Sequence, residues 1–469
     1  MWRVAVAWML VWHLAGCAAG ARQRPAWPPL ADEGEVHLFL EPLPREAGHL
    51  DFAVQSVAAL REDGGVVPLD LALRAVSGAD ARDQRLLASG RLPPGRYQGF
   101  LLGVGKASIE REGGRADLLV DAEPARIDRP FQVSARNATV FWLDLRFAGS
   151  IEKGFAFRPS FGVSIPERTQ PTLAGYCAST GRASLTVFDR RARRVTGVLP
   201  TGRAPRGLVL DAASARLYVA LSGEDQIAVV DAVAREEVTR IRLRGGDQPR
   251  DLALSPDGRT LIVLSPGSRT ASFVDPGAGL EVGRVAVGDE PWSLAMDRQG
   301  RRAYVVNRRS NSVTVLDVAN RAAVGTLATD PQPLRAALNR AGDRLYLIHA
   351  GSPYLGVFSL PSLAPVNRVF VGLGASALEV DARTDLVYVG WSIEGAVSVY
   401  DPFSLMPVDD FRVPDPVSYA AIDDAENTIL FLMPERRAIA VVDLTSRRIL
   451  GVLDVGVDPF DLTVSGERR

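Results

Sequence analysis

Residues that build metal centres and disulfide frameworks are scarce in this chain. Its 469 residues include 2 cysteines and 4 histidines, and the formal net charge is −1 at pH 7. Two cysteines exclude a scaffold of several disulfides, and so few imidazoles disfavour copper or haem centres that need several histidine ligands. The balanced charge provides no basic field for DNA or RNA. We therefore expect no metal site, no cofactor and no nucleic-acid partner.

Long hydrophobic runs are also rare. One run stands near the amino terminus, from Val4 to Leu14, with Arg3 before it and Leu14-Ala-Gly-Cys17 at its end. It is too short to span a bilayer comfortably, but it has the length of the apolar core of a signal peptide. We predict a signal peptide over residues 1–16. An ordinary signal peptide with an incidental cysteine is the alternative to a lipid-anchored one.

The residues from Leu14 to Cys17 resemble a bacterial lipobox. The resemblance implies cleavage before Cys17 and acylation of its thiol, so Cys17 is the expected lipid attachment residue and the membrane an expected partner. Several acyl chains make such an attachment lasting, whereas a single chain holds a protein only marginally. Ala18 after the cysteine resembles the enterobacterial pattern for the outer membrane, in the cell envelope. Residues 17–34, rich in Ala, Gly, Arg and Pro, are predicted to be a flexible spacer.

The second cysteine, Cys177, has no partner for an internal disulfide if Cys17 is lipidated. It lies in a predicted strand, Leu173–Ala178. We expect a buried and chemically inert thiol, which is the usual state of a free cysteine in a core.

Residues 35–166 lack helical periodicity and contain short strand-like runs separated by turn residues. The runs are Val36–Leu40, Asp51–Val57, Gly65–Leu71, Tyr97–Gly103, Ala116–Val120 and Thr139–Leu145. Such spacing predicts a β-sandwich. Within it, Leu92-Pro-Pro-Gly-Arg-Tyr97 resembles a turn of immunoglobulin-like and prealbumin-like modules, and in particular the lipoprotein domain of unknown function numbered 4382. This resemblance brings no activity with it.

The rest of the chain repeats itself at a nearly constant period. An aspartate ends the third strand-like segment of most copies, at steps of 42, 44, 42, 42, 42 and 42 residues, with one serine in its place: Asp189, Asp231, Asp275, Asp317, Ser359, Asp401 and Asp443. Each copy has four strand signals rich in β-branched residues, which excludes a helical solenoid. A four-stranded unit of this length is a propeller blade.

Counting first strands predicts seven blades. They start after Pro205, Pro249, Pro291, Pro333, Ala375, Val417 and Pro459. The region before Pro205 supplies only three strands, and the segment after Pro459 supplies one. The two ends of residues 172–469 are therefore predicted to complete one blade together, which closes the ring and leaves no blade-sized edge open. The predicted fold class is all-β: a seven-bladed β-propeller preceded by an immunoglobulin/prealbumin-like β-sandwich.

The repeat also carries a family resemblance. Arg216-Leu-Tyr-Val-Ala220 and Arg302-Ala-Tyr-Val-Val-Asn307 resemble the Y-V-T-N class of surface-layer-type β-propellers, and Gly288-Asp-Glu-Pro291 has the turn that precedes strand one in that class. The resemblance covers roughly three-fifths of the chain. It implies the propeller fold and no particular chemistry.

Repeat positions also predict which side chains approach the axis. The fourth residue after each strand-one start is small in most copies, whereas one copy has Glu379. We predict that Arg335, Glu379 and Asp461 lie at the channel. Lactonase-like relatives of this propeller class use a few charged residues at the channel mouth, so a lactonase-like or other hydrolase is the alternative function. A solvated polar side chain is the simpler interpretation of Glu379.

The loops that enter strand one and the hairpins between strands two and three emerge on one face of a propeller. That face is predicted to carry Arg206, Arg250, Trp292, Asn307, Arg308, Arg309, His349, Tyr354, Trp391, Glu394, Arg436, Arg437 and Phe460. Trp, Tyr and Arg dominate protein interfaces. The preferred hypothesis is a non-catalytic scaffold that binds an envelope protein, or a polysaccharide through Trp292 and Trp391, and the alternative is a set of loop residues with no partner.

Overall fold

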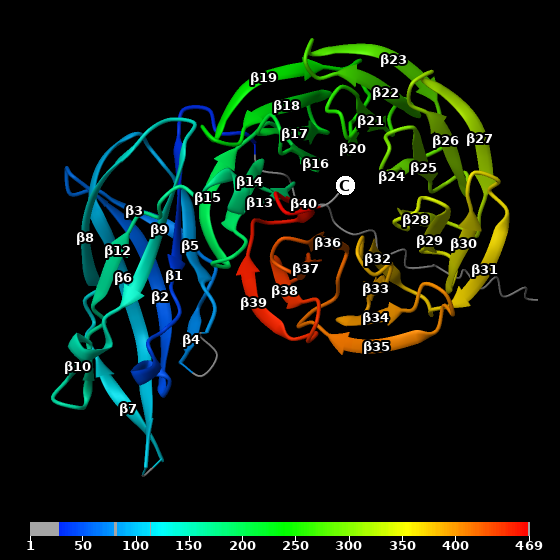
Figure 1. Ribbon diagram of the computed structural model, residues 1–469. Helices are drawn as coiled ribbons and strands as arrows, with labels where there is room; N and C mark the ends of the chain where they lie inside the picture. The colour runs from blue at the N-terminus through cyan, green and yellow to red at the C-terminus, as the bar shows by residue number, and fades with distance from the viewer. Residues whose placement is uncertain (1–27, 79–81, 113, 468–469) are drawn as a thin grey trace, which may run out of the picture.

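The computed structural model describes residues 28–78, 82–112 and 114–467. Two all-β domains lie side by side, a ring of seven sheets and a smaller domain against its rim (Figure 1). No helix in these residues is long and apolar enough to cross a membrane. The predicted signal peptide, Cys17 and most of the spacer lie outside the described residues.

Six blades of the propeller are continuous in the chain, each with four antiparallel strands in sequence order. Blades 1 to 3 comprise β16 (Pro205–Asp211), β17 (Arg216–Leu221), β18 (Gln226–Asp231), β19 (Glu236–Arg242), β20 (Asp251–Leu254), β21 (Leu261–Ser265), β22 (Thr270–Asp275), β23 (Leu280–Ala286), β24 (Pro291–Met296), β25 (Arg302–Asn307), β26 (Ser312–Asp317) and β27 (Ala322–Ala328). Blades 4 to 6 comprise β28 (Pro333–Leu338), β29 (Arg344–His349), β30 (Tyr354–Ser359), β31 (Pro365–Phe370), β32 (Ala375–Val380), β33 (Val387–Trp391), β34 (Ala396–Tyr400), β35 (Pro407–Arg412), β36 (Tyr419–Asp423), β37 (Thr428–Met433), β38 (Ala438–Asp443) and β39 (Ile449–Asp454).

The seventh blade joins the two ends of the repeat region. It contains β13 (Ala174–Ser179), β14 (Ser184–Asp189), β15 (Arg194–Pro200) and β40 (Pro459–Val464), in the order β15-β14-β13-β40. β40 pairs antiparallel with β13, so that Cys177 lies opposite Leu462. The predicted seven-bladed ring with a three-plus-one closing blade is confirmed.

Apolar side chains fill the space between neighbouring blades. One buried cluster combines Tyr176 of blade 7 with Leu208 and Val219 of blade 1. The next combines Tyr218 of blade 1 with Leu252 of blade 2. Because each sheet buries both faces against its neighbours, the middle strands of the blades are apolar on both sides.

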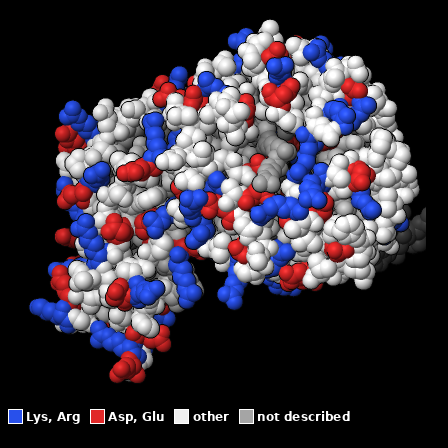
Figure 2. All heavy atoms as spheres, viewed as in Figure 1, with Lys and Arg blue, Asp and Glu red and all other residues white. Residues whose placement is uncertain are grey.

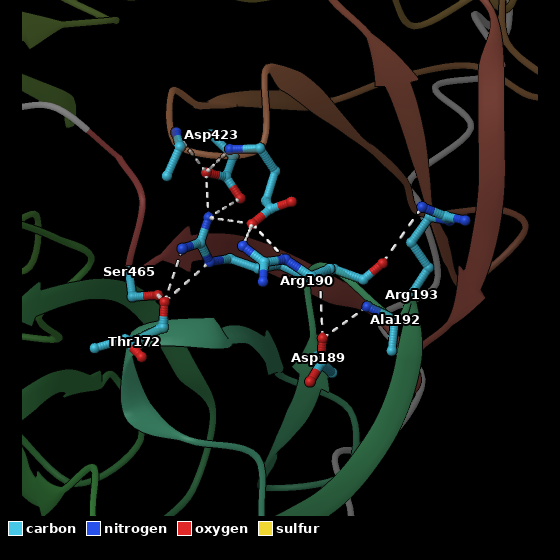
Figure 3. A network of polar contacts seen from close by, with 10 residues as sticks. Thr172, Asp189, Arg190, Ala192, Arg193, Asp423 and Ser465 are labelled. Carbon is cyan, nitrogen blue, oxygen red and sulfur yellow. Dashed lines mark hydrogen bonds and ion pairs between the residues drawn. The ribbon is translucent and has the colours of Figure 1, made fainter.

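A buried ion pair ties the closing blade to blade 6 (Figure 3). Arg190, in the turn after β14, donates from Nη1 to both carboxylate oxygens of Asp423 at 2.5 and 2.7 Å. Its Nη2 donates to the backbone oxygen of Thr172 at 2.7 Å. Ser465, just after β40, donates to the same oxygen at 2.8 Å. Both ends of the propeller region and blade 6 therefore meet at one guanidinium group.

The amino-terminal domain is built from β1 (Gly34–Leu40), β2 (Leu50–Arg61), β3 (Val66–Leu71), β4 (Ala75–Ser77), β5 (Arg85–Leu92), β6 (Gly95–Arg111), β7 (Gly114–Val120), β8 (Ala125–Val133), β9 (Ala138–Leu145), β10 (Ile151–Glu152), β11 (Ala156–Phe157) and β12 (Phe161–Ser164). Three 3-10 turns accompany them among the described residues: η1 (Arg45–Ala47), η2 (Phe147–Gly149) and η3 (Pro171–Leu173). The strands follow one hydrogen-bonded path, β10-β11-β7-β6-β2-β3-β5-β1-β9-β12, with β4 on β2 and β8 on β6. Their inward side chains form one core.

All six strand runs predicted for this domain are strands in the structure. β5 and β8 were not among them. β8 contains Pro130 and pairs only with β6, which is the edge position where a strand tolerates a proline.

The amino-terminal domain packs directly on the closing blade. Phe39 and Val140 share a buried cluster with Phe188 and Val195. The indole of Trp142 donates to the backbone oxygen of Val195 at 2.8 Å. Cys177 lies in the same cluster, fully buried, and burial raises the pKa of its thiol. The thiol is therefore protonated at neutral pH, as predicted for an inert cysteine.

The ion pair between Arg190 and Asp423 is expected to stabilise the folded protein, and a substitution can test this. Replacing Asp423 by alanine leaves the Arg190 guanidinium buried without its carboxylate, so we expect a loss of about 3–5 kcal/mol in the free energy of unfolding. Denaturant titration measures this loss. Asp211→Ala is the matched control, because Asp211 has the same repeat position but bonds only to its own turn. Equal destabilisation by the two variants would contradict the proposed role of the pair.

Candidate functional site

A repeated bulge at the start of the inner strands prepares the centre of the ring. In β24, Pro291 pairs with Asn307 and Ser293 with Val306, so Trp292 is an extra residue. Similar register shifts interrupt β16, β28 and β32. Bulges re-aim side chains. The inner-strand side chains therefore fall into two groups. First-position side chains, such as that of Trp292, come from the first residue after each strand-one start, and second-position side chains, such as that of Ser293, come from the second.

The first-position side chains stack on one another. The guanidinium carbon of Arg250 lies 3.4 Å from the ring centre of Trp292 and 4.8 Å from that of Phe460. Arg206 lies 5.3 Å from Phe460, and Arg308, from the hairpin after β25, lies 4.5 Å from Trp292. Cation–π contacts of this kind are favourable, more so when desolvated. The structure thus brings five residues of the predicted face into one stack.

Burial, reinforced by the positive charge of Arg206, lowers the pKa of Arg250 to about 9. The guanidinium is still protonated at pH 7. The stack therefore places a buried positive charge beside the axis, supported by the faces of two aromatic rings.

The second-position side chains line a cavity of about 240 Å³ at the axis. They are Asp251, Ser293, Arg335, Tyr419 and Asp461. The small residues predicted for the axis, among them Ala253, Ala295 and Ala337, form the next level of the wall together with Glu379. On the face seen in Figure 2, acidic and basic side chains gather around the centre of the ring.

The cavity opens away from the cation–π stack. Its lining continues to Asp297, Arg298 and Asn339, which lie where strand one turns into strand two, and includes none of the stacked side chains. Strand one runs from one face of the ring to the other. The channel residues Arg335, Glu379 and Asp461 therefore line a pocket that faces the side opposite Trp292.

Two carboxylates join neighbouring blades within this cavity. Asp461 accepts from the backbone N–H of Leu208 at 2.8 Å and of Leu462 at 2.9 Å. Asp251 accepts in the same way from Leu294 at 2.8 Å and Leu252 at 2.9 Å. Every carboxylate oxygen thus has a backbone donor, and one donor of each pair comes from the next blade.

Burial raises the pKa of both carboxyl groups. The pKa of Asp461 rises to about 7, because burial disfavours its charge and the negative charge of Asp251 adds to the effect. The guanidinium of Arg335 partly opposes the shift in both residues. A carboxyl group with a pKa near neutrality is the kind of group that general acid–base catalysis uses.

Tyr419 belongs to the same level, although it was not among the predicted channel residues. Arg335 lies 4.3 Å from its ring centre, and burial raises the pKa of its hydroxyl. The signal was present in the repeat: Tyr419 stands two residues after its strand-one start, as do Asp251, Arg335 and Asp461. The predicted Glu379 is half-buried in the wall, where its carboxylate accepts from the backbone N–H of Val380 at 3.2 Å.

Asn307 requires a correction. It was predicted to lie on an exposed face, but its side chain is fully buried and its amide donates to the hydroxyl of Thr314 at 2.9 Å. The residue ends β25 inside the hairpin, where the next strand supplies polar partners. His349 takes the equivalent place in blade 4, also buried, with Nδ1 3.1 Å from the backbone oxygen of Tyr354. Neither residue contributes to an exposed surface.

The other predicted face residues lie apart from the stack. Arg309 is exposed and reaches Glu290 only at 4.0 Å. Arg436 is exposed and pairs with Asp415 at 3.1 Å. Tyr354 and Trp391 are half-buried on blades 4 and 5.

An exposed apolar patch surrounds Tyr354 and Trp391. Phe370, Leu373 and Ile393 are 69%, 61% and 72% exposed. The ring of Phe370 meets that of Tyr354 edge-on, with centres 5.7 Å apart. We call these five residues the blade 4–5 patch. Comparison of the linkers before strand one gives a signal for it, because Leu373 stands where other copies have charged residues such as Asp247 and Asp289.

Metal ligands do not gather in the described part of the chain. No three His, Cys, Asp or Glu side chains there are placed to hold a metal ion together.

The raised pKa of Asp461 predicts a pH dependence of stability. The folded state binds this proton more tightly than the unfolded state, so the contribution of Asp461 to the free energy of unfolding is greatest at low pH and falls as pH rises from about 4 to about 7. Asp461→Asn removes this titration, and we expect a smaller decline across that window. Denaturant titrations at several pH values measure both slopes. Parallel slopes in the two proteins would contradict the assignment.

Comparisons with known proteins show the propeller fold. No protein-family model and no curated protein matches the chain. Among solved structures, Kuenenia stuttgartiensis hydrazine synthase is similar over 59% of this chain and 93% of its own, with TM-score 0.53 and 17% identity. A functionally unknown protein from Desulfotomaculum acetoxidans is similar over 61% and 98%, with TM-score 0.54 and 11% identity. Dihydro-heme d1 dehydrogenase NirN, in complex with DHE, is similar over 65% and 78%, with TM-score 0.50 and 15% identity.

Proposed function

We propose that this protein is a lipid-anchored protein of the bacterial cell envelope, whose propeller binds another envelope protein without catalysing a reaction. The observation that carries this proposal is the blade 4–5 patch. Three large apolar side chains stand mostly exposed on one face of the ring, next to Tyr354 and Trp391. Exposed apolar side chains that gather on one face of a protein often mark interaction sites.

A protein partner suits this face better than a polysaccharide. Sugars bind to propeller faces by stacking on open aromatic rings, but Trp292 is already contacted by the guanidinium groups of Arg250 and Arg308. The blade 4–5 patch presents aliphatic side chains and only part of Trp391. Aliphatic and aromatic side chains rimmed by charge resemble the centre of a protein interface.

The lipid anchor rests on the lipobox resemblance of Leu14 to Cys17. Residues 17–34 give the anchored cysteine a spacer before β1. The outer membrane is the proposed location, with the propeller in the periplasm or on the cell surface.

The finer fold assignments belong to the same proposal. We assign the amino-terminal domain to the immunoglobulin/prealbumin-like sandwiches and to the family of domain 4382. The hydroxyl of Tyr97 donates to the backbone oxygen of Pro93 at 2.9 Å, which is the bond of a tyrosine corner. We assign the propeller to the Y-V-T-N class on the motif that its second strands carry.

The arrangement of the channel carboxylates supports a role without catalysis. Both oxygens of Asp251 and of Asp461 accept backbone N–H groups. A carboxylate held in this way stabilises the contact between blades. The first function of the acidic pair is therefore to hold the inner strands together.

A hydrolase is the second candidate, and one observation favours it. The pKa of Asp461 is raised to about 7 inside a cavity that also contains Arg335 and Tyr419. A protonated carboxyl beside a guanidinium group is suited to activate an ester or lactone carbonyl. Turnover of a lactone that Asp461→Asn and Arg335→Ala both abolish would establish this candidate over the binding module.

Substitutions in the blade 4–5 patch test whether this surface binds the partner protein. In a triple variant, Phe370→Ser, Leu373→Ser and Ile393→Ser, we expect at least a tenfold loss in affinity for the envelope protein that co-purifies with the native chain. The reason is that apolar side chains at the centre of an interface contribute most of its free energy. Surface plasmon resonance with the purified partner measures the change.

The matched control is Phe403→Ser with Met406→Ser. These exposed apolar residues lie in the hairpin between strands three and four of blade 5, which emerges on the opposite face. The control should bind as the native chain does. If both variants lost the partner equally, or neither did, the blade 4–5 patch would not be the binding surface.

The anchor is tested separately. In Cys17→Ser we expect the protein to move from the membrane fraction to the soluble fraction, because the thiol that carries the acyl chains is gone. Fractionation of cells followed by immunodetection measures the distribution. Unchanged membrane association would exclude lipidation of Cys17 as the anchor.

A further inference from the structure

A cavity of about 230 Å³ lies at the junction of the two domains, apart from the channel and the blade 4–5 patch. On the amino-terminal side its walls come from β1, β3 and β5. On the propeller side they come from β14, the end of β39 and the hairpin before β38. Domain interfaces are preferred places for small-molecule sites. Neither domain forms this cavity alone.

Two buried residues in the wall have hydroxyl groups without a hydrogen-bond partner among the described residues. Ser184 and Thr186, on β14, are 2% and 3% exposed, and their hydroxyls make no hydrogen bond within the described part of the chain. His37, on β1, is 5% exposed, and its Nε2 faces the carboxylate of Glu35 at 3.5 Å. Buried polar groups normally have partners. Two hydroxyls at one cavity that lack partners in the described chain favour a ligand that supplies them.

Two charged groups of the wall, Arg437 and Asp70, have no ion pair with any described residue. Arg182 pairs with Glu35 at 2.8 Å, and Arg85 pairs with Asp454 at 2.9 Å. Burial alone would raise the pKa of Glu35, but the neighbouring His37 and Arg182 lower that pKa to about 2. The carboxylate of Glu35 is therefore ionised. The guanidinium of Arg437 makes no ion pair or hydrogen bond with any described residue. Arg437 and Asp70 are both exposed residues. Because the wall contains four arginines and two aspartates, its formal charge is positive.

The remaining wall is apolar. Phe39 and Leu86 contribute from the amino-terminal domain, and Val198, Val455 and Val457 from the propeller. The volume is below the roughly 300–1,000 Å³ of sites for drug-sized molecules. Hydrogen-bond donors and a cation beside an apolar wall in a small space suit a small molecule that has one anionic group and an apolar body.

We propose that the junction cavity binds a small organic carboxylate with an apolar body. The carboxylate pairs with Arg437 and accepts from the hydroxyls of Ser184 and Thr186. The apolar body lies against Phe39 and Leu86. A charge-assisted pair with a guanidinium provides affinity and orientation together, and the ligand, in contact with both domains, stabilises their junction.

Benzoate is the probe for this site, and benzyl alcohol is its uncharged counterpart. We expect saturable binding of benzoate to the purified protein in isothermal titration calorimetry, with a Kd on the order of 1 mM or tighter, and no saturable binding of benzyl alcohol. Arg437→Ala should weaken benzoate binding about tenfold or more, because it removes the cation. Arg309→Ala, at an exposed arginine of the equivalent hairpin in blade 3, should leave binding unchanged.

Thr186→Val separates a ligand-binding role from a structural one. Because the hydroxyl has no partner in the chain, its replacement by a methyl group should leave the free energy of unfolding unchanged or slightly higher, while benzoate binding weakens several-fold. The proposal is overturned if the native protein binds no benzoate saturably, if benzyl alcohol binds equally well, or if the affinity survives in both Arg437→Ala and Thr186→Val.

Discussion

The hydrogen-bonded pairing of β40 with β13 is the contact on which the rest of the structure depends. It completes the seventh sheet, and it brings the Asp461 carboxylate to the backbone of Leu208 in blade 1. The Arg190–Asp423 pair then fixes this sheet against blade 6. The axial cavity and the cation–π stack both use residues of β40, so neither exists in an open ring. The second domain rests on the same blade, through Phe188 and Val195.

The two levels of the inner strands divide the centre of the molecule. One bulge at the strand start separates Trp292 from Ser293, so that stacked cations and aromatic rings close one side while carboxylates and Arg335 line the other. The axial charges are largely satisfied by the propeller itself. Away from the axis, exposed apolar side chains lie on blades 4 and 5, and hydroxyl groups without a partner among the described residues lie at the domain junction. Recognition surfaces on a rigid ring are expected in such places.

The sequence predicts the propeller well because its information is periodic. Recurring aspartates and prolines set the number of blades, and the missing first strand before β13 predicts the closing partner. Position within one repeat also places Arg335, Glu379 and Asp461 at the axis. What it does not predict depends on contacts between copies. The burial of Asn307 arises from Thr314 across a hairpin. The stack arises from first-position residues of four neighbouring sheets. Phe370 is exposed because no other described element packs over its ring.

The place of β40 in the chain order has a consequence for biogenesis. β13 leaves the ribosome before any other propeller strand, yet its partner follows every other blade. Until then the nascent chain holds an unpaired strand edge and no axis, so the propeller stays incomplete through synthesis. Closure of the ring therefore has to wait until β40 has been synthesised and can reach β13.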